Sequence, residues 1–443
     1  MTPAQIRADL AGITAARTVS YTYDDEGRIV ETNDTAHGSG GGITTNTYND
    51  EDQLVRIASP EGIINYAYDD LGQLVRTWTG DTVSSVDGGT PTTENVYTYD
   101  TLGRLVTVTQ TWRQAIDIAD ETTSYTYDLN GNLATQVTEW NNVVSDYDYD
   151  EMNRLTHLTH FVDSDGDRIL DDMSEQTLAQ FDYSYLADGT RSQAVETDDL
   201  GDVTTITWDY DGLNRLVSET SESTNDDRDY SDAFTYDLSS NRLTQTHTTL
   251  SDVVTTVYFY DANDRLLAEV KDSTADDSQD TFTEYTYNNT NQTGKTVYEG
   301  TTSGGSDITS SVTYTYDASG RMVMVQTDSD GDGNINSTVT YTYDTSSHRV
   351  TETTSDPGSG TTTTRSFLFD PQNATGYGKQ IEEHVDGQLS KTFIIGHMII
   401  AQHNATNGLL NFIQDGHGNT RALVNIAASI VQRFAFDAYG KTL

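Results

Sequence analysis

Along most of the chain, aromatic and polar residues alternate in short segments that end at an acidic residue. Residues 97–105 show the pattern most clearly and read Tyr-Thr-Tyr-Asp-Thr-Leu-Gly-Arg-Leu. A period of two puts both rings on one face of a β-strand and the threonine on the other, and these residue types favour strands. Asp100 and Gly103 then suit a type I turn with a G1 bulge, after which residues 105–111 run back. The segment is therefore predicted to form a β-hairpin.

The same unit recurs through the chain. Its second aromatic residue can be aligned fourteen times, and eleven of these anchors are followed by Asp and two by Asn. Tyr185, which precedes Leu186, departs most clearly from the pattern. The anchors span 369 − 23 = 346 residues, or about 27 residues per unit, which lies within the range of repeat architectures. The anchors are Tyr23, Tyr48, Tyr68, Tyr99, Tyr127, Tyr149, Tyr185, Tyr210, Tyr236, Tyr260, Tyr287, Tyr316, Tyr343 and Phe369.

These repeats predict an all-β protein in which antiparallel hairpins form a spiral sheet. Thr, Tyr, Val and Gly lower the helix propensity throughout, and only residues 4–16 offer a weak helical pattern. A unit of about 27 residues fits two to three strands of a continuous spiral better than a propeller blade of about 40–50 residues. The tyrosines are expected to stack between neighbouring units as a structural ladder. Asn153, Asn214 and Asn263 are expected at the left-handed positions of their turns.

Charge and composition exclude several functions. The chain has 24 Lys and Arg against 70 Asp and Glu, a formal charge of −46, so it would repel nucleic acids and anionic membranes. The absence of cysteine excludes disulfides, thiolate metal sites and a cysteine nucleophile. The longest apolar stretch, residues 393–401, is interrupted by Gly396 and His397 and is too short to span a membrane. Residues 1–20 show no apolar core of a secretory signal.

The recurring Tyr-x-Tyr-Asp-x-x-Gly-Arg-Leu unit resembles the YD-repeat, or RHS-repeat, family of bacterial RHS proteins, toxin-complex C subunits and animal teneurins. The resemblance covers the chain from Tyr21 onward. Residues 415–423 and 434–440 add to it. They are similar to the opening of the RHS-associated core, which usually reads Asp-x-x-Gly-x-x-Arg-x-Leu and then Tyr-x-Tyr-Asp-x-x-Gly.

The resemblance implies a hollow β-shell whose wall is structural and whose interior holds a toxin or other cargo. It also implies a protein that is secreted or displayed at the cell surface. In that family the core continues into a segment whose aspartates cut the toxin free, whereas this sequence stops at Leu443, so the shell role is expected here and the protease role is not. The predicted organisation is a leader or partial repeat at 1–20, a repeat array at 21–365 and an RHS-core-like cap segment at 366–443.

Two acidic loops are candidate calcium sites. Residues 163–172 and 328–336 place oxygen-bearing side chains at alternate positions around glycine, as the first half of an EF-hand loop does. Ser174 and Val339 stand where the EF-hand has its bidentate Glu, so weak affinity is expected. The alternative is that both segments are solvent-facing hairpin tips. The candidate ligands are Asp163, Asp165, Asp167, Ile169 through its carbonyl, Asp171, Asp328, Asp330, Asp332, Asn334 and Asn336.

No motif for catalysis stands out. The nine histidines include no His-Glu-x-x-His pair, and no Gly-x-Ser-x-Gly elbow is present. His397 and His403 adjoin the apolar stretch and are expected in the core, and the other histidines at the surface or in turns. A non-catalytic scaffold is therefore expected. Two alternatives remain open: a cell-surface adhesion module whose exposed Tyr and Trp, such as Trp140, bind glycans or a partner protein, and an enzyme that uses an unrecognised pair of carboxylates.

Overall fold

The computed structural model describes residues 18–35, 42–80, 93–112, 121–170, 175–225, 228–273, 280–300, 307–373, 375–404 and 406–442. These residues form 33 β-strands in one sheet and contain no α-helix. Each strand pairs antiparallel with the next along the chain, from β1–β2 to β32–β33. None of the described ranges holds a helix with the length and apolar character needed to cross a membrane. The predicted all-β class and antiparallel hairpin order are confirmed.

The strands have the following bounds. The first sixteen are β1 (Val19–Tyr23), β2 (Ile29–Asp34), β3 (Gly42–Tyr48), β4 (Leu54–Ser59), β5 (Gly62–Tyr68), β6 (Leu74–Thr79), β7 (Thr93–Tyr99), β8 (Leu105–Trp112), β9 (Glu121–Tyr127), β10 (Leu133–Thr138), β11 (Val143–Tyr149), β12 (Leu155–Val162), β13 (Gln176–Tyr185), β14 (Arg191–Asp198), β15 (Val203–Tyr210) and β16 (Leu216–Ser223). The others are β17 (Tyr230–Tyr236), β18 (Arg242–Thr249), β19 (Val253–Tyr260), β20 (Leu266–Ser273), β21 (Thr281–Tyr287), β22 (Gln292–Glu299), β23 (Ile308–Tyr316), β24 (Met322–Asp328), β25 (Ser337–Tyr343), β26 (Arg349–Asp356), β27 (Thr361–Asp370), β28 (Lys379–Val385), β29 (Gln388–Ile395), β30 (Ile399–Asn404), β31 (Gly408–Gln414), β32 (Thr420–Asn425) and β33 (Ile430–Arg433).

Each repeat unit is one hairpin, since the fourteen anchors lie at or next to the ends of the odd-numbered strands β1 to β27. In the β7–β8 turn, the Asp100 carboxylate accepts hydrogen bonds from the backbone N–H groups of Leu102 and Arg104, both at 2.9 Å. Gly103 adopts a φ of +80°, which glycine reaches without steric cost, and the strand register shifts between Thr98 and Tyr99. The predicted turn with a bulge is confirmed.

One prediction about the turns is wrong. Asn153 and Asn214 do adopt left-handed φ values of 59° and 58°, but in the β19–β20 turn the left-handed residue is Asp264, with φ 59°, and not Asn263. The left-handed position is the third residue after the aspartate that follows the anchor. Asn263 lies one place earlier, where its N–H donates to the Asp261 carboxylate at 2.8 Å.

Neighbouring hairpins are joined by the second tyrosine of each unit. The Tyr99 hydroxyl donates to the Leu74 carbonyl of the preceding hairpin (2.7 Å), and the Tyr127 hydroxyl donates to the Leu105 carbonyl (2.6 Å). The Arg104 guanidinium also lies over the Tyr127 ring, 4.4 Å from its centroid. The tyrosines therefore form a structural ladder through hydroxyl–carbonyl hydrogen bonds and arginine contacts, whereas the expectation was that their rings stack. The same hydroxyl–carbonyl bond recurs at Tyr48, Tyr68, Tyr185, Tyr236, Tyr260, Tyr287 and Tyr343.

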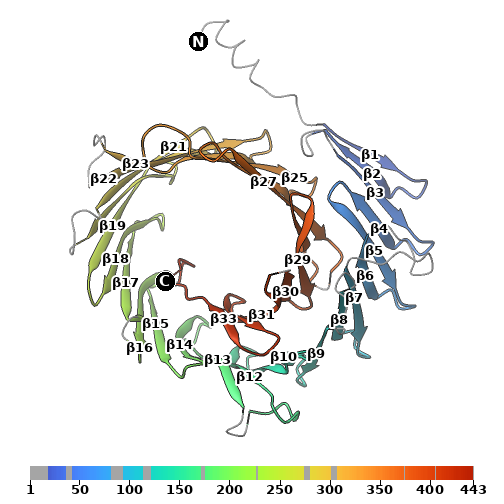
Figure 1. Ribbon diagram of the computed structural model, residues 1–443. Helices are drawn as coiled ribbons and strands as arrows, with labels where there is room; N and C mark the ends of the chain where they lie inside the picture. Colours follow the sequence, from blue (N-terminus) through green and yellow to red (C-terminus); the bar gives the residue numbers. More distant parts are fainter. Residues whose placement is uncertain are drawn as a thin grey trace, which may run out of the picture.

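The sheet curves into a spiral that overlaps itself (Figure 1). β27–β33 lie inside the wall formed by the earlier strands and pack against its concave face. Three buried clusters fill the space between the two layers, joining β5 to β27–β29, β7–β9 to β29–β31, and β11–β14 to β31–β32. Their central members include Ile64, Leu368 and Ile395; Val108, Ile394 and Ile400; and Leu158, Ile413 and Val424.

The two layers come into close contact at Gly396, in the turn between β29 and β30. A Cβ atom there would lie 1.9 Å from the Tyr125 hydroxyl oxygen and 2.9 Å from Ile400 Cδ1. Any larger residue would push the inner layer away from the wall. Glycine at this position is therefore a requirement of the overlap.

Among the described residues, no second layer of strands covers the concave face of β17–β25, and Tyr439 of the final segment contacts β17 and β18 there. Between residues 240 and 345, Tyr258 and Ala268 are the only buried hydrophobic residues among those that the structure describes. The predicted boundary between the repeat array (21–365) and the cap segment (366–443) falls within β27. The sheet continues through this strand without a break, so the boundary stays a prediction. Of the predicted leader, residues 1–17 lie outside the described ranges, and Val19 and Ser20 belong to β1.

Candidate functional site: the inner trough and the acidic loops

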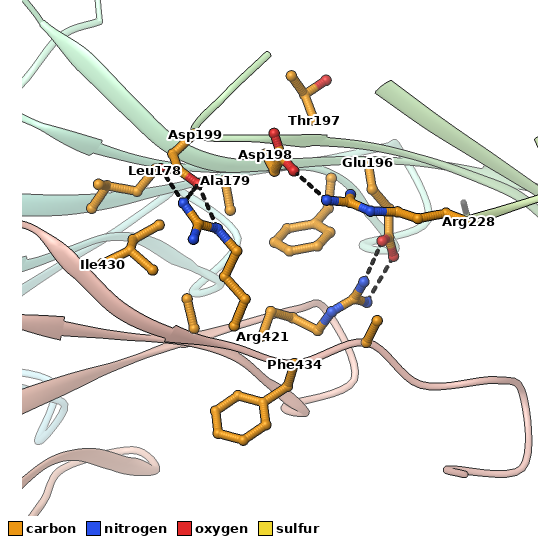
Figure 2. A pocket seen from close by; sticks show the side chains of 14 residues that line it. Leu178, Ala179, Glu196, Thr197, Asp198, Asp199, Arg228, Arg421, Ile430 and Phe434 are labelled. Atoms are coloured by element: carbon orange, nitrogen blue, oxygen red, sulfur yellow. Dashed lines mark hydrogen bonds and ion pairs between the residues drawn. The ribbon is translucent and has the colours of Figure 1, made fainter. Parts of the chain in front are cut away.

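The segment after β33 runs along the concave face of the wall (Figure 1). Arg433 donates hydrogen bonds to the Asp199 Oδ1 atom from its Nη2 atom at 2.7 Å and from its Nε atom at 3.0 Å. Arg421 of β32 binds the Glu196 carboxylate of β14 with two hydrogen bonds and lies 3.3 Å from Asp415. Figure 2 shows the interaction of Arg421 with Glu196 at the edge of a cavity. The volume of this cavity is about 260 Å³. Charged groups from segments more than 200 residues apart thus fasten the inner layer to the wall.

Two further cavities follow along the same face. One of about 530 Å³ is lined by Tyr230 and His247 of the wall and by Phe436 of the final segment. The next, of about 470 Å³, is lined by Arg242, Tyr258 and Lys271 of the wall and by Tyr439 and Lys441. We call this run of three cavities, between residues 421–442 and β13–β21, the inner trough. Its floor is the concave sheet and its side is the final segment of the chain.

A carboxylate pair lies under the final segment, and sequence reasoning missed it. Glu219 of β16 and Asp232 of β17 are cross-strand partners, and both are buried. Glu219 accepts hydrogen bonds from the Tyr230 hydroxyl (2.5 Å), the Trp208 indole (2.6 Å) and the Ala438 backbone N–H (3.2 Å). Burial raises the pKa of Glu219, although these donors oppose the shift. The carboxylate therefore anchors the final segment.

The pairing of Glu219 with Asp232 could have been found only from the register of β16 and β17. Asp232 accepts from Gln245 (2.9 Å) and faces His247 (3.2 Å). Both carboxylate oxygens of Glu219 and Oδ1 of Asp232 accept hydrogen bonds from other groups of the protein, and Oδ2 of Asp232 lies 3.2 Å from His247 Nδ1. That arrangement suits positioning of the chain more than a reaction with a substrate.

Two other carboxyl groups are buried between the layers. Asp370, at the end of β27, accepts a hydrogen bond from the Tyr66 hydroxyl of β5 at 2.9 Å, and burial raises its pKa to about 6. Glu121 of β9 is 4% exposed, and burial raises its pKa to about 7. Its Oε2 atom has no hydrogen-bond partner among the described residues. The overlap is therefore sensitive to the protonation of these acids.

The structure corrects the sequence-based placement of two side chains. His160, expected at the surface or in a turn, is buried in β12, where its imidazole lies 2.8 Å from both Ser145 Oγ and the Gln414 carbonyl of the inner layer. Burial lowers its pKa to about 4. Trp140, named as an exposed binding residue, donates its indole N–H to Asn411 of β31 at 3.1 Å and packs against the second cluster. Both residues join the layers, which the sequence could not show.

The first acidic loop brings together part of its predicted ligand set. Carboxylate oxygens of Asp163, Asp165, Asp167 and Glu175 lie within 4.8 Å of one another. Glu175 was not predicted, because it lies one residue beyond the position at which an EF-hand has its glutamate. Ile169 is exposed in this loop. Asp171 lies outside the described residues.

The second loop gathers three acids. Carboxylate oxygens of Asp328, Asp330 and Asp332 lie within 4.8 Å of one another. Burial would raise the pKa of Asp328, but the backbone N–H groups of Gly333 and Gly331 outweigh it and keep that pKa below its usual value. Asn334 donates to Asp332 (2.9 Å), and the Asn336 side-chain oxygen accepts from the Ser329 N–H (2.5 Å). The two asparagines thus shape the loop by internal hydrogen bonds.

Comparison with known proteins gives matches to solved structures alone. No family model matches the chain, and no curated protein matches it. A structure titled TcdB2-TccC3 without its hypervariable C-terminal region matches with 14% identity and a TM-score of 0.44, covering 96% of this chain and 24% of that one. A Photorhabdus luminescens Tc holotoxin pore matches with 13% identity and a TM-score of 0.41, covering 99% and 28%. The chain therefore spans about a quarter of these proteins.

The described residues have the fold of a spiral β-shell, built from one continuous antiparallel sheet of hairpins. Its hairpins coincide with the fourteen units whose recurring motif carries the sequence resemblance.

Proposed function

We propose that this chain is a non-catalytic wall that encloses or displays a toxin or another polypeptide cargo, as part of a secreted or surface-displayed assembly. The observation that supports this most is the self-overlapping spiral. Three apolar clusters fasten β27–β33 inside the wall. On the concave face of β17–β25 the described residues form no second layer of strands, and the final segment contacts β17 and β18 there through Tyr439. Such a wall is closed by packing on one side and free to contact cargo on the other.

The arrangement of acids supports a scaffold over an enzyme. The carboxyl groups whose pKa burial raises, Glu121, Asp146, Glu219 and Asp370, lie on or at the ends of four different strands. Glu219 and Asp370 hold groups that join the two layers. Their burial thus serves the contact between layers.

Enclosure is testable by protease protection. A flexible, protease-labile polypeptide is fused after Leu443, and its cleavage rate is compared with that of the same polypeptide fused before Met1. Because residues 434–442 lie on the concave face, we expect at least tenfold slower cleavage of the C-terminal fusion. Equal rates at the two ends would overturn enclosure.

We further propose that the two acidic loops bind Ca²⁺ weakly and stiffen their hairpins. Supporting this, the structure places four carboxylates together in one loop and three in the other, and hard cations prefer oxygen ligands. The midpoint of thermal unfolding is measured with excess Ca²⁺ and with chelator, for the parent and for Asp330→Asn and Asp165→Asn. We expect Ca²⁺ to raise the midpoint of the parent by a few degrees and of each variant by less. An identical midpoint in Ca²⁺ and chelator would refute the proposal.

A further inference from the structure

Three hairpins have arginine at one inward-facing position where nine others have an apolar residue. Eight residues after the first aromatic of a unit, most hairpins have an apolar residue, such as Leu105 after Tyr97. Three units have arginine there instead: Arg191 after Tyr183, Arg242 after Phe234 and Arg349 after Tyr341. The apolar residues at this position are Ile29, Leu54, Leu74, Leu105, Leu133, Leu155, Leu216, Leu266 and Met322.

Each of the three arginines lies over aromatic rings of the wall. Arg191 lies 3.8 Å from the centroid of the Tyr183 ring. Arg242 lies 5.7 Å from that of Phe234 and 4.7 Å from that of Tyr258, the first aromatic of the next hairpin. We call each such arginine, with the first aromatic residues around it, a ring seat.

The third seat repeats the second one. Arg349 lies 5.0 Å from the centroid of the Tyr341 ring and 5.9 Å from that of Phe367, which is again the first aromatic of the next hairpin. Both seats thus use the ring of their own hairpin and the ring of the following one.

Two of the seats hold a ring from the end of the chain. At the first seat, Arg191 lies 2.8 Å from His417 Nδ1 and donates to the Gly416 carbonyl at 3.3 Å. At the second, Arg242 lies 4.7 Å from the centroid of the Tyr439 ring, which also makes an edge contact with Phe234. The Tyr439 hydroxyl lies 2.9 Å from that of Tyr236. In each case a polypeptide segment on the concave face brings one ring to the arginine: His417 contacts Arg191 through its ring nitrogens, and Tyr439 lies with its ring face on Arg242.

The third seat is open. Within the part of the chain that the structure describes, the aromatic rings that contact Arg349 are those of Tyr341 and Phe367. Both rings belong to the two neighbouring hairpins that form the seat, and neither comes from the final segment of the chain. The Arg349 side chain is 47% exposed and has one ion pair, with Glu352 at 3.4 Å. A guanidinium flanked by rings, with an exposed face, is a site for a further aromatic side chain.

We propose that the Arg349 seat binds an aromatic side chain of an extended polypeptide segment lying on the concave face. The occupant is a polypeptide because the two equivalent seats of this chain hold rings of a polypeptide whose backbone is bound beside them. The inference rests on the proposed function, since that segment is the enclosed or displayed cargo.

The test uses the full chain and a fluorescent peptide with the sequence of residues 434–443, whose tyrosine models the occupant. Arg349→Leu is expected to weaken peptide binding about tenfold. Arg265→Leu, which makes the same charge change at a turn arginine, should leave it within twofold. Because nine hairpins have an apolar residue at the equivalent place, Arg349→Leu should keep the parent unfolding midpoint. A peptide with leucine in place of its tyrosine should bind about tenfold more weakly to the parent.

N-acetyl-tyrosine amide serves as a second probe that needs no space for a peptide. We expect the parent chain and Arg265→Leu to perturb the NMR signals of this probe and Arg349→Leu not to perturb them. That result would support binding of an aromatic side chain at Arg349. Equal binding of both probes by the parent and Arg349→Leu, or a loss caused only by Arg242→Leu, would overturn it. The protease-protection assay is repeated with Arg349→Leu. If the C-terminal fusion stays protected while peptide binding does not depend on Arg349, the proposed seat is wrong and the proposed enclosure is not.

Discussion

The double-layered and single-layered parts of the wall are built from the same hairpin but differ in what supports them. In β5–β14, the inward face packs against the inner strands β27–β32, and Ile64 and Val108 of the wall and Ile394 of the inner layer are fully buried. In β21, β23 and β25, the first aromatic residues Tyr285, Tyr314 and Tyr341 remain partly exposed. Tyrosine hydroxyl bonds between hairpins occur in both parts.

The difference shows which interactions are general and which are local to the overlap. Turn hydrogen bonds and tyrosine bonds suffice to continue the sheet from one hairpin to the next. Apolar burial is concentrated where the chain returns to cover itself. The wall is thus expected to be most stable in its overlap and most adaptable in β17–β25.

The largest expected effect compares one repeat position in the two parts. Leu105 in the overlap and Leu266 in the single layer are equivalent, but Leu105 is 4% exposed and packs in a cluster with Ile394, Ile400 and Leu409. We expect Leu105→Ala to lower the free energy of unfolding by about 3 kcal/mol and Leu266→Ala by about 1 kcal/mol, because only the first leaves a sealed cavity. Chemical denaturation of both variants measures this. Equal losses would mean that the overlap adds no packing.

A smaller effect concerns the pH dependence of the overlap. Glu121 is protonated when folded below about pH 7 but ionises near pH 4.5 when unfolded. The contribution of Glu121 to the free energy of unfolding is therefore fully present below pH 4.5 and is lost as the pH rises to about 7. The loss is on the order of 3 kcal/mol. Glu121→Gln removes this titration. We expect the variant to exceed the parent in stability at pH 7.5 and to match it near pH 4.5, as followed by thermal melts across that range.

Asp165→Asn is a useful control for that comparison, because it removes an acid from an exposed loop outside the overlap. Its stability difference from the parent should not follow the same pH profile. If Glu121→Gln and the parent keep a constant difference from pH 4.5 to 7.5, the protonated state of Glu121 in the folded chain is refuted.

The smallest expected effect is that of the partly exposed ion pair between Arg433 and Asp199. The Arg433 side chain is 44% exposed, so solvent screens the pair. Arg433→Ala should lower the free energy of unfolding by less than about 1 kcal/mol while increasing hydrogen exchange at residues 430–442. Unchanged exchange there would show that the pair does not fasten the final segment.

The hairpins could be predicted from the sequence because their rules are local. The alternation around Tyr97 and the Asp100–Gly103 turn lie within ten residues of each other, and the structure confirms them. The overlap could not be predicted, because contacts such as Tyr66 with Asp370 join residues 304 positions apart and depend on the curvature of the whole sheet. His160 was misplaced for the same reason.

Part of the candidate site could have been predicted from the sequence. The three inward arginines appear as soon as the fourteen units are aligned on their aromatic residues, since the substitution of Leu by Arg is visible in the sequence alone. The pairing of Glu219 with Asp232 needed the register of β16 and β17, which depends on a loop that has no repeat consensus. The role of Glu175 needed the loop conformation.

The overlap itself can be tested most directly by a distance measurement. The chain has no cysteine, so Thr98→Cys on the wall and Gln388→Cys at the start of β29 can carry two unique spin labels, and both positions are exposed. Electron paramagnetic resonance should give one narrow distance distribution, with Gly396→Val broadening it by separating the layers. A broad distribution in the parent, unaffected by Gly396→Val, would contradict a wall that closes on itself.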